Sequence, residues 1–146
     1  MPFGNVTKND LAKFFAHGTS MPAYGASWYL HLHTASPGGA GTSSTNEAAY
    51  DNYTRIAASR DSGGFTICDS DGTVNASGAA FKNAAEITFP ECDSAFVGSE
   101  TIVAISLCDN AGQIIRYAVL SVDQQIVVNA NDTPRIPAGA AIFNHA

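Results

Sequence analysis

The chain contains 146 residues, of which 45% are hydrophobic and 14% are charged, against roughly 25% charged residues in an average soluble domain. This composition argues against a disordered chain, so we expect one domain over residues 1–146 with an N-terminal arm over 1–26. The net charge is −6 and the seven lysines and arginines are spread thinly along the chain, so direct nucleic-acid binding is not expected.

Residues 6–17 carry the pattern of a short helix. Thr7 is a candidate N-cap, apolar residues that include Phe14 and Phe15 recur at helical spacing, and Gly18 can end the helix. Because the two phenylalanines need a covering surface, we expect this helix to cap a sheet.

From residue 27 the hydrophobic period changes to two, which predicts a strand. One face carries a tryptophan and two leucines, while the other carries Tyr29, His31 and His33. The two histidines project from one face and could in principle ligate a metal ion. No third ligand is evident, so we favour a structural role over a metal site or an interface contact.

Residues 36–47 form a loop rich in glycine, serine and threonine, with no apolar residue to anchor it. Loops of this length in a compact domain are usually functional, mobile or ordered by a partner.

Short apolar segments separated by turn-forming residues then follow one another to the end of the chain. The further strands are expected at residues 53–59, 65–68, 85–89, 102–107, 114–122, 126–128 and 140–143. Many short strands without alternating helices indicate an all-β fold, an antiparallel jelly-roll-like β-sandwich with one short N-terminal helix.

Two patterns that could carry chemistry are weak. Residues 69–72, DSDG, resemble the start of a calcium loop, but Ala80 stands where such a loop needs glutamate, so we expect a plain turn. Nothing in the spacing makes the neighbouring carboxylates converge on a substrate, as glycoside hydrolysis would require. These carboxylates are Glu86, Glu91, Asp93 and Glu100. No nucleophile, phosphate-binding or metalloprotease motif is present, so no catalytic residue is predicted.

Cofactors and membranes are not expected either. Cys68, Cys92 and Cys108 lack the paired spacing of a zinc site and are best explained as reduced, buried side chains. No stretch approaches the roughly 20 apolar residues that span a bilayer, and the N-terminus lacks the pattern of a signal peptide. We therefore expect a protein made in the cytoplasm.

Four stretches together resemble one family of phage proteins: WYLHLHTASPGGAG (28–41), NEAAYDNYTRIAASR (46–60), the segment over 82–121 and NDTPRIPAGAAI (131–142). Their order and spacing agree with the family over most of the chain. The family consists of small virion proteins, often labelled phage tail fibre proteins. The best understood proteins of this family are capsid decoration (cement) proteins of short-tailed phages.

The resemblance implies a jelly-roll β-sandwich that forms homodimers, with trimers as the alternative, on the outer surface of the capsid. It implies a partner, the major capsid protein, whose neighbouring subunits it bridges, and it implies no active site. The contact with the shell is expected at the N-terminal arm and the long loop, because neither segment is anchored locally. The residues expected to touch the capsid are Phe3, Ser36, Pro37, Thr42 and Asn46.

Two other functions are compatible with the sequence. A tail fibre or baseplate component could bind a host-surface glycan through aromatic side chains that stack on sugars. Tyr24, Tyr29, Tyr50 and Tyr53 are the candidates for this role. A small capsule-degrading enzyme would need a convergent pair of carboxylates, for which the sequence offers no motif.

Overall fold

The structure, a computed structural model, describes residues 3–20 and 23–143 and shows one helix followed by short strands. The elements are α1 (Asn5–His17), β1 (Ser27–His33), β2 (Ile56–Ser59), β3 (Phe65–Cys68), β4 (Ala80–Asn83), β5 (Ile87–Thr88), β6 (Glu100–Ile102), β7 (Ala104–Cys108), β8 (Ile114–Val119), η1 (Val122–Gln124), β9 (Ile126–Val128), β10 (Arg135–Ile136) and β11 (Ile142–Phe143).

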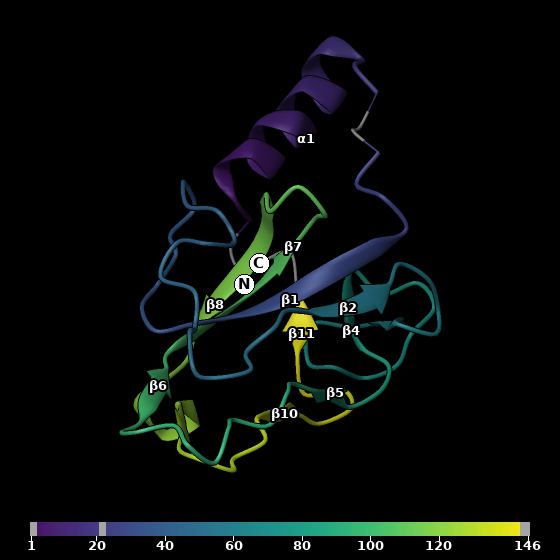
Figure 1. Cartoon of the computed structure of the whole chain (residues 1–146). Helices are drawn as coiled ribbons and strands as arrows, with labels where there is room; N and C mark the ends of the chain where they lie inside the picture. Colours follow the sequence, from purple (N-terminus) through teal and green to yellow (C-terminus); the bar gives the residue numbers. More distant parts are fainter. Residues whose placement is uncertain (1–2, 21–22, 144–146) are drawn as a thin grey trace.

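The strands form several antiparallel sheets, so the all-β fold class is confirmed. The largest sheet has the order β2-β1-β7-β8, and a second sheet has the order β11-β4-β3. The pairs β10-β5 and β6-β9 lie at the end of the molecule opposite α1 (Figure 1). The tight turn at residues 109–112 joins β7 to β8, with Gly112 in the left-handed region at φ 84°.

Side chains from all these sheets meet in one hydrophobic core. Leu30 and Leu32 of β1 pack there with Leu107 of β7, Phe65 of β3 and Phe143 of β11. The alternation expected for residues 27–33 therefore places its leucines correctly. Because β1 lies between β2 and β7, and the other face of its second half is covered as well, all four residues from Leu30 to His33 are buried.

One expected strand, over residues 102–107, is in fact two strands in different sheets. The chain leaves the β6-β9 pair at Ile102 and enters the large sheet at Ala104. Between them, the amide of Val103 donates to the carbonyl oxygen of His33, and its own carbonyl accepts from Leu120. The apolar sequence continues without a break through this point, so the hydrophobic pattern cannot show the change of sheet.

Two short strands, β4 and β10, were not expected. In β4 the polar Asn83 is buried and its side-chain amide donates to the carbonyl oxygens of Ala85 and Pro137 at 2.8 Å. The Asn83 side-chain oxygen accepts from the amide of Ala141 at 2.9 Å. A buried asparagine that satisfies backbone groups beside it and in the connection between β10 and β11 interrupts the apolar alternation by which a strand is recognised.

The helix begins earlier than expected and does not cap a sheet. Gly4, not Thr7, is the N-cap, and Thr7 is buried inside the helix, where its hydroxyl donates to the carbonyl oxygen of Ile114 at 3.3 Å. Gly18 ends the helix at φ 64°, as expected. The helix touches β8 only near its N-terminal end and then projects from the body (Figure 1).

Candidate functional site

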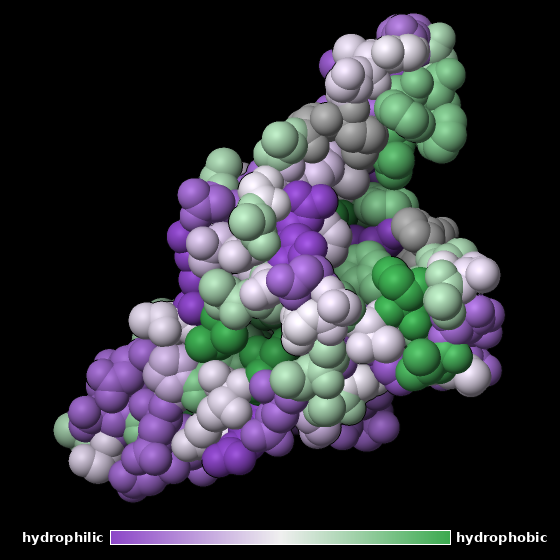
Figure 2. Space-filling view, turned by 90° about the vertical axis from the view of Figure 1, so that its right-hand side faces the viewer, coloured by the Kyte–Doolittle hydropathy of each residue, from purple (hydrophilic) through white to green (hydrophobic). Residues whose placement is uncertain are grey.

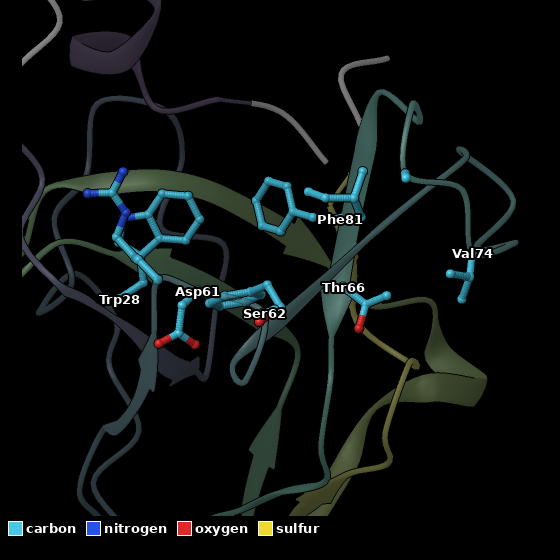
Figure 3. A pocket seen from close by; sticks show the side chains of 10 residues that line it. Trp28, Asp61, Ser62, Thr66, Val74 and Phe81 are labelled. Carbon is cyan, nitrogen blue, oxygen red and sulfur yellow. The ribbon is translucent and has the colours of Figure 1, made fainter.

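An aromatic groove lies between the start of β1 and the β3-β4 hairpin (Figure 3). The ring of Trp28 packs against Phe65 and Phe81 with centroid distances of 5.5 and 5.4 Å. The groove has a volume of about 600 Å³. Its lining residues are Trp28, Arg60, Asp61, Ser62, Phe65, Thr66, Ile67, Val74, Ala76 and Phe81.

The two charged side chains of the aromatic groove already have partners. The Arg60 guanidinium lies 4.8 Å from the centre of the Trp28 ring and donates to the carbonyl oxygen of Gly25 at 2.7 Å. One Asp61 carboxylate oxygen accepts from the amides of Gly63 and Gly64 at 2.8 and 3.2 Å. These contacts hold the charged turn at residues 59–61 against the body.

The opening of the aromatic groove is therefore mainly apolar. Ile67 and Val74 are 47% and 66% exposed, although both are aliphatic. Aromatic and aliphatic side chains form most of the walls of this groove, with the hydroxyl groups of Ser62 and Thr66 beside them. Its chemistry suits an apolar side chain or the apolar face of a helix.

The histidines of β1 form a second, buried cluster. Burial lowers the pKa of His33, so its ring is neutral. Its Nδ1 lies 2.9 Å from the carbonyl oxygen of Thr45 and must donate to it, so Nε2 accepts from the Ser106 hydroxyl at 2.7 Å. The Ser106 oxygen lies 3.3 Å from the sulfur of Cys108, whose pKa burial raises to about 11, so this thiol remains a donor.

His31 holds the end of the loop at a second point. Its Nδ1 lies 2.6 Å from a carboxylate oxygen of Glu47, and its Nε2 is buried without a partner among the described residues. Burial lowers the pKa of His31, and Glu47 offsets this effect only in part. Together the two histidines fix the polar loop, residues 36–47, onto β1.

The polar loop is therefore anchored. A capsid contact was expected on this loop because the sequence showed no local anchor for it, and that reason is wrong. The amide of Thr34 donates to the carbonyl oxygen of Asn46 at 2.9 Å, and the amide of Ala48 donates to that of Leu32 at 2.8 Å. At the other end, the carbonyl oxygen of Gly39 accepts from the first amide of α1 at 2.6 Å. Polar groups, and not apolar side chains, hold the loop.

The residues expected to touch the capsid fall into two groups. Ser36, Thr42 and Asn46 are exposed on the polar loop, whereas Pro37 is buried. Phe3 is half-buried, and the guanidinium of Arg116 lies 3.4 Å from the centre of its ring. Only the first three are available to a partner without rearrangement, and the contact itself stays a prediction.

The histidine cluster does not have the geometry of a catalytic site. A hydroxyl bonded to histidine is the starting arrangement of a serine nucleophile. Here His33 and Ser106 are 0% and 1% exposed, and the second histidine nitrogen meets a carbonyl instead of a carboxylate. Among residues 3–20 and 23–143, no group of three histidine, cysteine or acidic side chains could hold a metal ion.

Three of the four carboxylates considered for catalysis have backbone or cationic partners of their own, and the fourth, Glu91, is exposed. Glu100 accepts from the amide of Tyr50 at 2.7 Å, Asp93 from the amide of Ala95 at 2.7 Å, and Glu86 from Arg135 at 3.1 Å. Residues 69–72 form the expected turn, between β3 and β4. The three cysteines are free and buried, as predicted.

The tyrosines considered for sugar stacking do not form one exposed surface. Tyr50 is buried, and the Tyr53 hydroxyl accepts from the amide of Leu32 at 3.0 Å. Tyr24 donates to Asp10 at 3.2 Å, and the Arg55 guanidinium lies 4.3 Å from the centre of the Tyr29 ring. The aromatic surface lies instead in the groove, whose members come from three strands.

The family model described as podophage GP4 fiber I protein gp80 matches residues 2–144. No curated protein matches the chain. Within the described residues, no helix has both the length and the apolar character needed to cross a bilayer.

Proposed function

The chain belongs to the podophage GP4 fiber I protein gp80 family, and from this membership we propose that it is a structural subunit of the fibre apparatus of a short-tailed phage. The observation that carries the proposal is a family match that covers residues 2–144, almost the whole chain. Membership makes the protein a structural component of the phage virion.

The geometry supports a role in protein contacts. Within the described residues, the hydroxyl–histidine pair is buried and Glu86, Asp93 and Glu100 bind other partners, so these groups form no accessible catalytic arrangement. Aromatic and aliphatic side chains, in contrast, remain accessible in the aromatic groove and on α1. Exposed apolar surface of this kind is typical of contacts with other proteins.

Capsid decoration is the second candidate function. It is favoured by a compact body built around one core, with the polar Ser36, Thr42 and Asn46 displayed together on one anchored loop. In this role each copy would bridge neighbouring subunits of the major capsid protein on the outer surface. Many modest contacts would then resist the opening of the shell.

The number of copies per virion separates the two functions. We would determine it by quantitative mass spectrometry of purified virions against the major capsid protein. A few to a few dozen copies, with antibody labelling at the tail, are expected for a fibre subunit. One copy per capsid subunit, or a simple fraction of it, with labelling over the head, would overturn the fibre proposal and establish decoration.

A further inference from the structure

The apolar face of helix α1 starts on the body and continues beyond it. Thr7, Leu11, Phe14 and Phe15 are spaced so that they lie along one side of the helix. Thr7 is buried against β8 and Leu11 is half-buried. Phe14 and Phe15, the Phe pair, are 45% and 79% exposed, so the outer half of the stripe has no cover within the described residues.

The Phe pair is ordered for contact. The two rings meet edge to face with their centroids 5.2 Å apart. The helix that carries them is tied down at its base by Thr7 and by the bond from Tyr24 to Asp10. A fixed helix that presents two aromatic rings loses little conformational freedom when a partner covers them.

The aromatic groove offers a surface of matching chemistry on the same chain. Its walls are aromatic and aliphatic, and its charged groups are already engaged. The exposure of the Phe pair shows that α1 does not fill the groove of its own copy. Figure 2 shows apolar surface on the projecting helix and again on the body below it, with a hollow between the two.

Charge favours a second copy as the occupant. Helix α1 carries two lysines and one aspartate, whereas the rest of the chain carries five lysines and arginines and twelve acidic residues. Arg60 and Asp61 both line the groove and offset each other in charge, whereas Asp69 and Asp71 lie on the hairpin loop that also carries Val74. The basic helix of one copy is therefore attracted to the acidic body of another.

We propose that the outer half of α1 docks into the aromatic groove of a second copy of this chain. Each copy has both surfaces, so the contact can be made twice in a twofold dimer or pass around a closed ring. The Phe pair would lie against Trp28 and Phe81, with Val74 at the edge of the contact. This assembly does not depend on whether the protein sits on the tail or the head.

The mass of the full chain in solution, by size-exclusion chromatography with light scattering at about 50 µM, tests the contact. The unmodified chain is expected as a dimer or a closed ring, and Phe15→Ser and Val74→Lys are each expected to shift it to the monomer. Val6→Ser on another face of α1 and Val97→Lys on a distant loop are the matched controls, because both positions are also exposed. A monomeric unmodified chain, or an oligomer unchanged by Val74→Lys, would overturn the proposal.

A crosslink identifies the two surfaces directly. The three native cysteines are buried, so Phe15→Cys and Val74→Cys introduce accessible thiols. Mixing the two single variants under mild oxidation is expected to give a disulfide between one chain of each kind, while Phe15→Cys with Val97→Cys is not. Crosslinking only between two Phe15→Cys chains would mean that helix pairs with helix and would contradict the proposal. A monomeric chain still found on virions would contradict this inference and leave the proposed function intact.

Discussion

The polar loop over residues 36–47 is held by the body at more points than helix α1 is, although the helix is the more apolar segment. The loop is fixed through His31 and His33 at one end and through the start of α1 at the other. The helix leaves the body after its first turns and exposes the Phe pair. Apolar content alone therefore does not decide which of the two segments the body covers.

The physical reason lies in what each segment satisfies. The buried imidazole of His33 needs partners for both nitrogens, and the Thr45 carbonyl and the Ser106 hydroxyl supply them. Withdrawing the loop would leave a buried polar group unpaired, which costs about 1–3 kcal/mol. The Phe pair extends beyond β8, and no apolar surface among the described residues of its own copy covers it.

The largest expected effect comes from His33→Ala. It removes both hydrogen bonds at a fully buried position and leaves a cavity, so the free energy of unfolding should fall by about 3 kcal/mol. Urea denaturation measures this loss. Thr42→Ala, on the exposed part of the same loop, is the control and should change stability by less than about 0.5 kcal/mol. Equal effects of the two changes would show that the loop is not held through β1.

A smaller loss is expected for Glu47→Ala. It leaves the buried His31 ring without its partner and should lower the free energy of unfolding by about 1–2 kcal/mol. Hydrogen exchange should show faster loss of protection at the amides of Thr34 and Ala48, which pair the loop to β1. The exposed Glu91→Ala serves as the control. Unchanged exchange at both amides would rule out an anchoring role for Glu47.

Mild acid should weaken the same anchor. Burial lowers the pKa values of His31 and His33 below their ordinary value, so the unfolded chain binds more protons as the pH falls through about 6.5. Stability is therefore fully present above this pH and decreases below it, by at most about 1.4 kcal/mol per pH unit for each histidine. Denaturation at pH 7.5 and 5.5 measures the difference. If a double variant with His31→Gln and His33→Gln kept the full pH dependence of stability, that dependence would not come from these two histidines.

The smallest effect on stability is expected for Phe15→Ser. The side chain is 79% exposed in the single chain, so the free energy of unfolding of the monomer should change by no more than about 0.5 kcal/mol. Thermal and urea denaturation under dilute, monomeric conditions measure it. A loss above about 2 kcal/mol would mean that Phe15 packs within its own chain, and the contrast between helix and loop would fail.

Much of the fold could be predicted from local patterns. The strands at 27–33, 65–68 and 126–128 and the end of the helix at Gly18 all agree with the structure. Each depends on interactions between residues close in sequence. The division at Val103 and the short strands β4 and β10 depend on partners distant in the chain, so no local pattern reveals them.

The candidate site was less predictable. The histidines were recognised as a structural pair, but their partners Thr45, Glu47 and Ser106 lie 12, 16 and 73 residues away in sequence. The aromatic groove combines Trp28, whose strand was predicted, with Phe81 on a strand that was not. The sequence offered four tyrosines as candidates for sugar stacking, but the same residues could equally belong to the core, and sequence alone does not tell which rings are buried.

An all-β chain with one N-terminal helix can be predicted from the sequence alone, and its family membership follows from the same residues. Periodicity and turn-forming residues act over a few positions, so both can be recognised without knowing the rest of the fold. That a polar loop is anchored and that an apolar helix projects becomes clear once the strands are packed. Those outcomes depend on which distant side chains satisfy buried donors and on where the sheet ends, and both are settled only when the strands pack.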